Sequence, residues 1–264
     1  QVLAIVTVEG SATSHTAILA RTLGIPAVVG CPSVTSLTEG THVHVDGNTG
    51  AVEISSDDGM RPSSSPTAPA SQRDEVATGG RTSDGVPIAL MANIGSPDEA
   101  AQAAAAGAEG IGLLRTEFLY LRAGTPPSAS DQESALRKVL AAFPAQPVVV
   151  RLLDAGGDKP LPFLALADEP NPALGVRGLR ALRTHERILD DQLDAIARSA
   201  AASSARVAVM APMVTDARDA EWFRDRVRAH RNWPGDIAIG VMIETPAAAL
   251  TADAVLAASD FASI

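Results

Sequence analysis

Short apolar runs alternate with helix-forming stretches from residue 87 to residue 264 of this 264-residue chain. The apolar runs have the length of strands and are continuously hydrophobic, which is typical of parallel strands covered on both faces. Strands are expected at 87–94, 110–114, 147–153, 207–213, 237–243 and 261–264. Helices are expected from Ser96 onward and at 131–142, 177–183, 186–203, 216–231 and 246–258. Repeated βα units of this kind predict an α/β fold.

Two α/β architectures fit such a repeat, a (β/α)8 TIM-type barrel and an open doubly wound parallel sheet. The doubly wound sheet would carry a glycine-rich loop after its first strand, and no such loop follows residues 87–94. The preferred interpretation is a barrel that is truncated after about five βα units.

Two further segments precede the barrel units. Residues 57–86 are rich in proline, serine and glycine, and because this composition cannot bury a core it predicts a linker. Residues 1–56 predict a separate, partial β/α domain, with a strand, a turn, a helix and a second strand followed by a hairpin at 41–54. The expected organisation is therefore a partial domain at 1–56, a linker at 57–86 and a truncated barrel at 87–264.

The acidic balance and the single cysteine restrict what the chain binds and where it works. The formal net charge of −10 disfavours broad binding to nucleic acid. Cys31 is the only cysteine, which excludes an intrachain disulfide and favours a reducing cytoplasm. No apolar run is long enough to cross a bilayer, so membrane insertion is not expected. The chain starts at Gln1 without a signal-peptide pattern, and both ends are expected to lie inside a longer protein.

His15 stands at the predicted start of a helix, directly after Thr13 and Ser14, which are residue types that cap helices. The positive end of the helix dipole disfavours an imidazolium there and keeps the ring neutral. A neutral ring nitrogen is a nucleophile, and the free backbone N–H groups nearby can hold a phosphate. His15 is therefore a candidate for covalent phosphoryl transfer. The alternative is a helix cap or a surface histidine.

Charged residues follow the carboxyl ends of the expected strands, where the active site of a barrel lies. Arginine forks match the geometry of phosphate and carboxylate, so a cluster of them predicts a small anion that carries both groups. Magnesium commonly binds through few carboxylates plus substrate oxygens, which makes a carboxylate on this edge a candidate ligand. The candidates are Arg115, Arg151, Lys159 and Arg177 for the anion and Glu244 for Mg²⁺. The alternative is a set of ion pairs among surface loops, with Glu117 as the local partner of Arg115.

Three other residues with reactive side chains are assigned structural roles. His42 and His44 share one face of an expected strand, and without a third ligand they predict a solvated surface rather than a metal site. Cys31 follows a strand and is expected to be a packed or loop thiol.

The residues around His15 read T-S-H-T-A-I-L-A-R-T-L-G-I-P-A-V-V-G. This stretch resembles the phosphohistidine signature of the phosphoenolpyruvate-utilising enzymes, which include enzyme I of the sugar phosphotransferase system, pyruvate phosphate dikinase and phosphoenolpyruvate synthase. One departure is Glu9-Gly10-Ser11-Ala12, which stands where the family usually has two glycines. In the barrel region, residues 107–119, 150–159, 171–177 and 240–248 are similar to enzyme I motifs.

The resemblance implies roles for the candidate residues. His15 would carry the phosphoryl group, and Glu244 would be a Mg²⁺ ligand. The implied phosphoenolpyruvate ligands are Arg115, Arg151, Arg177 and Lys159. The implied fold is a swivelling phosphohistidine domain joined to a phosphoenolpyruvate-binding barrel. The implied activity is phosphotransfer from phosphoenolpyruvate to protein, with a histidine-containing phosphocarrier protein of the sugar phosphotransferase system as acceptor and a homodimer formed through the intact barrel.

Several alternatives stay open. The family's second magnesium carboxylate and its proton-donating cysteine would follow residue 264, so the chain by itself is expected to be inactive. A dikinase or phosphoenolpyruvate synthase would add an upstream ATP-grasp domain, and a multiphosphoryl fusion protein would use this region as a phosphorelay module. A non-catalytic regulatory or binding module is a further alternative, which the presence of His15 together with three arginines argues against.

Overall fold

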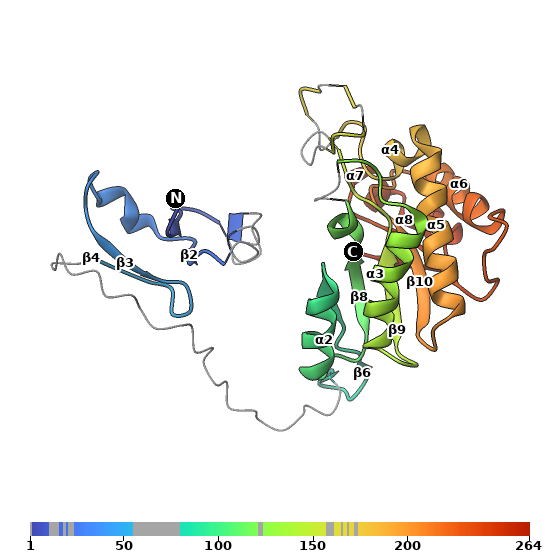
Figure 1. Cartoon of the computed structure of the whole chain (residues 1–264), viewed down its shortest axis with the longest axis horizontal. Coiled ribbons are helices and arrows are strands. Elements are labelled where there is room, and N and C mark those ends of the chain that lie inside the picture. Colours follow the sequence, from blue (N-terminus) through green and yellow to red (C-terminus); the bar gives the residue numbers. More distant parts are fainter. Residues whose placement is uncertain are drawn as a thin grey trace. The chain divides into compact units, whose positions relative to one another are not determined.

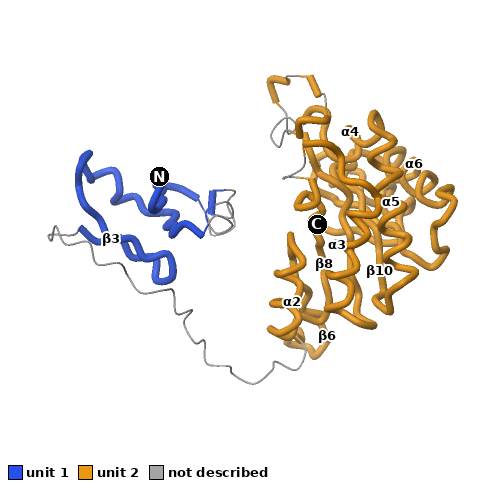
Figure 2. Tube along the Cα trace, viewed as in Figure 1, with its two compact units in different colours: residues 1–75 blue, residues 76–264 orange. Residues whose placement is uncertain are grey.

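The computed structural model of the chain describes residues 2–10, 16–17, 20, 24–54, 80–120, 124–156, 161–164, 166–167, 169–171 and 174–264. These residues belong to two compact units, residues 1–75 and 76–264, which Figure 2 colours separately. The domain limits predicted at residues 56 and 86 remain predictions, because residues 55–79 lie outside the described part of the chain.

The first unit contains a parallel strand pair and an antiparallel hairpin. β1 (Ile5–Val6) pairs with β2 (Ala27–Val28), and a 3-10 helix, η1 (Pro32–Ser36), follows. β3 (Val43–Asp46) and β4 (Ala51–Ile54) form the hairpin that the alternating sequence predicts. The two strands and the hairpin of the prediction are thus confirmed, whereas the predicted turn and the start of the helix after it fall on residues 11–15, which lie outside the described part of the chain.

The turn of this hairpin is held by the Asp46 carboxylate, whose Oδ1 accepts the backbone N–H of Asn48 at 2.8 Å. This bond and a further one from Thr49 lower the pKa of Asp46 below its ordinary value. His42 and His44 are exposed next to the turn. Both imidazoles lie in solvent, as the alternation of the strand predicts.

A six-stranded parallel sheet forms the second unit and curls into a half-barrel. Its strands are β7 (Ala92–Ile94), β8 (Ile111–Arg115), β9 (Pro147–Arg151), β10 (Arg206–Ala211), β11 (Ala238–Met242) and β12 (Phe261–Ser263). They lie side by side in chain order, and each pairs in parallel with the next. A doubly wound sheet would reverse its strand order at a switch point, so the unbroken order supports the barrel and contradicts the open alternative.

Helices connect successive strands of this sheet, and Figure 1 shows α3, α5 and α6 in a row alongside the strands. The helices are α2 (Pro97–Ala105), η2 (Thr116–Leu119), α3 (Ala129–Ala141), α4 (Leu179–Thr184), α5 (Glu186–Ala201), α6 (Ala217–Arg228), α7 (Pro246–Leu250) and α8 (Ala252–Ala257). The side chains of Ser96, Ser128, Asp216 and Thr245 cap α2, α3, α6 and α7 by accepting the backbone N–H three residues on. Within the described residues, no helix has the length and apolar character needed to cross a membrane.

The core lies between the sheet and these helices. Val148 and Val150 of β9 are at most 1% exposed, and so are Leu189 and Leu193 of α5, which belong to the same buried cluster. Full burial of one such side chain stabilises the fold by about 1.5–3 kcal/mol. Helix α5 is therefore fixed tightly behind the strands that lead to the candidate site.

The run at 87–94 is not the single buried strand that its apolarity predicts. It is split into β6 (Pro87–Ile88) and β7, and β6 pairs antiparallel with β5 (Gly80–Arg81). This outer hairpin leaves Ile88 50% exposed and Leu90 66% exposed. Apolarity alone does not distinguish such a hairpin from a strand of the main sheet.

The helix expected at 246–258 is also divided. Thr251 separates α7 from α8 because its backbone, with φ −121° and ψ 28°, lies outside the helical region. The other predicted helices and strands of this unit are confirmed, with ends that differ by a few residues.

Gly110 precedes β8 with a φ of +156°, and a Cβ there would lie 2.5 Å from the carbonyl oxygen of Pro147 on β9. We expect Gly110→Ala to lower the free energy of unfolding by about 2 kcal/mol, because the two backbones would have to separate. Gly235→Ala is the matched control, since a Cβ there meets no atom within 4 Å. Its effect should stay within about 0.5 kcal/mol. Chemical denaturation of the full-length protein that carries this chain measures both, and equal effects would contradict the close approach.

Candidate functional site

Parallel pairing brings the carboxyl ends of neighbouring strands to one edge of the sheet. Arg115 ends β8 and Arg151 ends β9, and their Cα atoms are direct partners in the register of these two strands. Neighbouring strands lie about 4.8 Å apart, so two cationic side chains start from adjacent positions. Like charges placed opposite each other repel, and this arrangement therefore needs carboxylates close by.

Arg151 is 6% exposed and contacts three other parts of the unit. Its Nη2 lies 2.5 Å from Glu117 Oε1, and its Nη1 lies 3.8 Å from Asp154 Oδ2. Nη1 also donates to the sulfur of Met242 on β11, 3.7 Å away. Arg151 Nε and Glu117 Oε2 are buried and lack a hydrogen-bond partner among the described residues. Buried polar atoms without a partner are uncommon in a folded protein, so both atoms mark this cluster as unusual.

Arg177 is held by Asp154 through two hydrogen bonds. Its Nε and Nη2 donate to Oδ1 and Oδ2 of Asp154 at 3.1 and 2.8 Å, which is the fork geometry of a strong arginine–carboxylate pair. Gly178, with φ +54°, permits this packing, because a Cβ there would lie 2.9 Å from the side chain of Met213 and 3.3 Å from Asp154 Oδ1. Asp154 therefore joins Arg177 to Arg151 in one buried cluster.

Glu117 is the partner of Arg151 and not of Arg115, so the local pairing expected from the loop-ion-pair alternative is wrong for this carboxylate. The reason is that the chain enters η2 at Thr116, which ends the alternation of side chains and turns Glu117 toward β9. Arg115 is half-buried, and among the described residues it forms no ion pair. One cation of the cluster is therefore left without a protein carboxylate within that part of the chain.

Glu244 lies two residues beyond β11 and is exposed. Its Oε1 accepts the backbone N–H of Met213 at 2.7 Å, and Met213 has a φ of +58°, which is uncommon for a residue with a side chain. No group of three or more His, Cys, Asp and Glu in the described ranges could hold a metal ion. A single accessible carboxylate nevertheless fits Mg²⁺, which keeps several waters and binds substrate oxygens.

The structure thus brings together most of the predicted site residues that it describes. Arg151 and Arg177 share Asp154, Arg115 is the register neighbour of Arg151, and Glu244 follows a strand of the same sheet. His15 and Lys159 lie outside the described residues, so their roles remain predictions. The sequence did not indicate Asp154 as the partner of the arginines, and it suggested the wrong arginine for Glu117. Charge balance was the available signal, because buried arginines require acidic partners and Asp154 is the first acid after β9.

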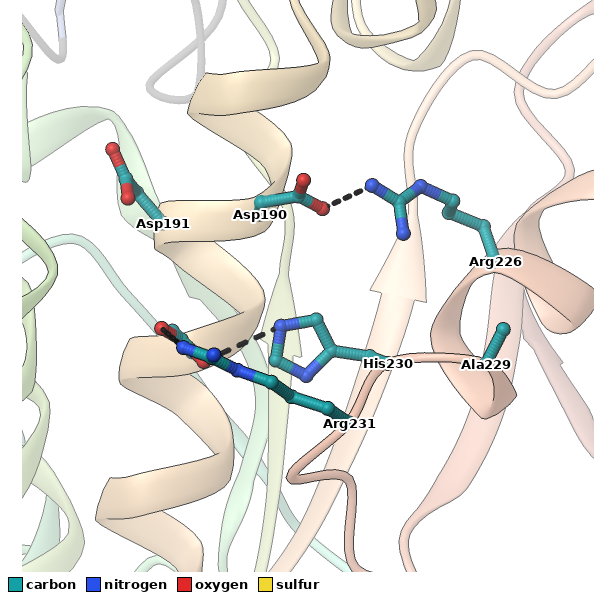
Figure 3. Close-up of a pocket in the computed structure, with 7 residues that line it drawn as sticks. Asp190, Asp191, Arg226, Ala229, His230 and Arg231 are labelled. Atoms are coloured by element: carbon teal, nitrogen blue, oxygen red, sulfur yellow. Dashed lines mark hydrogen bonds and ion pairs between the residues drawn. The ribbon is translucent and has the colours of Figure 1, made fainter.

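A hollow with a volume of about 360 Å³ lies on the helical side of the sheet, between α5 and the end of α6 (Figure 3). Several of its charged side chains are in contact with one another. Arg226 contacts Asp190, and His230 Nε2 lies 3.4 Å from Asp194 Oδ1. Because three aspartates line this hollow, the strand-end cluster is the better candidate for binding an anion.

Comparison with known proteins gives a consistent result. Residues 69–264 match the family model described as the PEP-binding domain of PEP-utilising enzymes, and residues 1–50 match the mobile domain of PEP-utilising enzymes. The chain is 50% identical over its whole length to the phosphoenolpyruvate-protein phosphotransferase of Streptomyces coelicolor, of which it covers 47%. It is 40% identical over its whole length to a protein of the same name from Haloferax volcanii, of which it covers 48%. It is 39% identical to the multiphosphoryl transfer protein of Xanthomonas campestris, again over the whole chain and over 32% of that protein.

The pairing of Glu117 with Arg151 generates a prediction about stability. We expect Glu117→Gln to lower the free energy of unfolding by about 3 kcal/mol, because the buried guanidinium would lose its shortest ion pair. Asp225→Asn is the control, since the Asp225 side chain is 69% exposed and pairs with Arg224 at 3.0 Å. That change should cost less than about 0.5 kcal/mol. Both are measured by chemical denaturation of the full-length protein, and a Glu117→Gln effect as small as the control would show that the pair is not important for stability.

Proposed function

Because the chain belongs to the PEP-utilising enzymes, we propose that it is part of a phosphoenolpyruvate-protein phosphotransferase. The phosphoryl group of phosphoenolpyruvate moves to His15 and then to a histidine of a small phosphocarrier protein of the sugar phosphotransferase system. The observation that carries this proposal is the buried arginine cluster at the strand ends. The chain spans about half the length of the phosphotransferases it matches, so the activity belongs to a longer protein. That protein works in the cytoplasm and forms a homodimer through its complete barrel.

The charge of the cluster suits phosphoenolpyruvate, which carries a phosphate and a carboxylate on a small skeleton. Counted without Glu244, which is assigned to Mg²⁺, the three arginines Arg115, Arg151 and Arg177 exceed the carboxylates of Glu117 and Asp154 by one positive charge. The carboxylates hold the guanidinium forks in place before the substrate arrives. Little reorganisation is then needed on binding, which favours both affinity and transition-state stabilisation.

In the transfer step, a neutral ring nitrogen of His15 attacks the phosphorus atom. The bond between phosphorus and the bridging oxygen breaks, and its electron pair leaves with enolpyruvate, which takes up a proton to give pyruvate. The guanidinium groups stabilise the negative charge on the phosphoryl oxygens during transfer. The phosphoryl group on His15 is subsequently attacked by the histidine of the phosphocarrier protein.

Mg²⁺ is the proposed cofactor, and Glu244 is the residue of this chain that would hold it. When bound together with the substrate, the ion would supply charge neutralisation at the phosphate. The hydrogen bond from the Met213 N–H keeps Glu244 at the strand-end edge, which supports this assignment.

A second candidate function uses the same chemistry in a different chain. The 39% identity to a multiphosphoryl transfer protein extends over all of this sequence, which supports an alternative role as the phosphorelay module of a fusion protein, although the identity to a phosphotransferase is higher at 50%. The residues of this region would act identically in both candidates. The other domains of the full-length protein therefore distinguish a phosphotransferase from a multiphosphoryl fusion protein.

The test is phosphorylation of the full-length protein with radiolabelled phosphoenolpyruvate and Mg²⁺, without nucleotide. We expect acid-labile label on His15, and His15→Ala should abolish it because the nucleophile is lost. His44→Ala is the matched control, because the exposed His44 imidazole lies on the hairpin and should not affect labelling.

Label that persists in His15→Ala would contradict the assignment of the nucleophile. Label that appears on His15 only with ATP would indicate the dikinase or phosphoenolpyruvate synthase branch of the family. An absence of label from either donor would contradict the proposed function and leave a binding module.

A further inference from the structure

We propose that Gln192 is a positioning residue for the anion site, a role that rests on the proposed function. Gln192 lies on α5, and its side chain is completely buried. Although α5 is on the helical side of the sheet, the carboxamide of Gln192 is hydrogen-bonded to the ends of β8 and β9. It thereby controls the backbone from which the charged groups of the site project.

Three consecutive hydrogen bonds make this connection. Gln192 Oε1 accepts the backbone N–H of Leu153 at 3.0 Å, and Gln192 Nε2 donates to Thr116 Oγ1 at 3.0 Å. The Thr116 hydroxyl in turn donates to the backbone carbonyl of Arg151 at 2.9 Å. All four residues are at most 6% exposed, so water does not compete for these bonds.

The residues in this hydrogen-bonded chain are direct neighbours of the charged ones. Thr116 stands between Arg115 and Glu117, and Leu153 immediately precedes Asp154. The carbonyl that Thr116 binds belongs to the arginine at the end of β9. One carboxamide therefore fixes the backbone beneath two arginines and both carboxylates of the cluster.

The position requires a group that accepts and donates at the same time. The hydrogen-bond ladder of β9 ends with Leu152, whose N–H donates to the carbonyl of Met210 at 2.9 Å. The next N–H, that of Leu153, is buried, and a buried N–H without a partner is costly. A carboxamide accepts this N–H and still donates to Thr116, whereas an ionised carboxylate cannot donate and an alkyl chain can do neither.

Gln132 on α3 provides a matched control. It is 1% exposed, its Oε1 accepts from the Tyr120 hydroxyl at 3.0 Å, and its Nε2 donates to the Pro127 carbonyl at 3.1 Å. Burial raises the pKa of Tyr120 above its ordinary value, which keeps this phenol protonated as a donor. Gln132 thus has the residue type, burial and number of bonds of Gln192, but neither of its partners adjoins a charged residue of the site.

The experiment compares Gln192→Met with Gln132→Met in the full-length protein. Both variants lose two buried hydrogen bonds, so we expect similar falls in the midpoint of thermal unfolding. We expect the kcat/KM of self-phosphorylation by phosphoenolpyruvate to fall about tenfold more in Gln192→Met, because small displacements of positioning groups are amplified in the rate. Thr116→Val is a second variant, in which the new side chain has nearly the same shape as threonine. It removes the hydroxyl that bonds to Gln192 and to the Arg151 carbonyl, and it should also lower kcat/KM. It carries the test alone if Gln192→Met does not fold.

The outcomes separate the two proposals. If Gln192→Met and Thr116→Val keep the kcat/KM of Gln132→Met while the wild-type protein is labelled, Gln192 is only a structural residue and the inference is overturned. If the wild-type protein is not labelled by phosphoenolpyruvate, the proposed function fails, and the inference fails with it.

Discussion

The repulsion between two arginines at the ends of neighbouring parallel strands governs the arrangement of the candidate site. The register places the Cα atoms of Arg115 and Arg151 opposite each other, and the Arg151 side chain is buried, which leaves its charge little screened by water. Glu117 and Asp154 counter this repulsion, and Asp154 also binds Arg177 through both of its oxygens. The carboxylates reach these positions because η2 begins directly after β8 and because Asp154 lies three residues beyond the end of β9. The site is thus a cluster of charges in which carboxylates hold two of the three arginines in place.

The order of the strands makes this cluster possible. Each strand pairs with the next one in the sequence, so residues that are far apart along the chain meet at the same edge. Arg151 on β9 contacts Met242 on β11, and Glu244 beyond β11 binds the backbone of Met213 beyond β10. The left-handed backbone of Met213 and the close packing at Gly178 both lie in this edge. Strained or tightly packed backbone at one location is common where a fold holds functional groups in place.

The sequence was sufficient to predict much of this architecture, because apolar runs of strand length and capped amphipathic helices are local patterns. The predictions at 87–94 and 246–258 were the exceptions. Residues 87–88 join an outer hairpin instead of the main sheet, and Thr251 interrupts the helix with a non-helical backbone. Tertiary context decides both cases, because apolarity does not. Position near a strand end was the reason for proposing the arginines and Glu244 as site residues, and their roles stay predictions. Which side chain each site residue pairs with was not predictable from the sequence. Gln192 and Thr116 are 76 residues apart and carry no local pattern, so only the folded structure brings them together.

The most direct test of the account is the structure of the full-length protein with bound phosphoenolpyruvate and Mg²⁺. We expect the phosphate and carboxylate of the ligand to contact Arg115, Arg151 and Arg177. The ion pairs of Glu117 with Arg151 and of Asp154 with Arg177 should persist in the complex. Phosphoenolpyruvate bound at another place on the sheet, or arginine forks that stay closed on their carboxylates without touching the ligand, would contradict it.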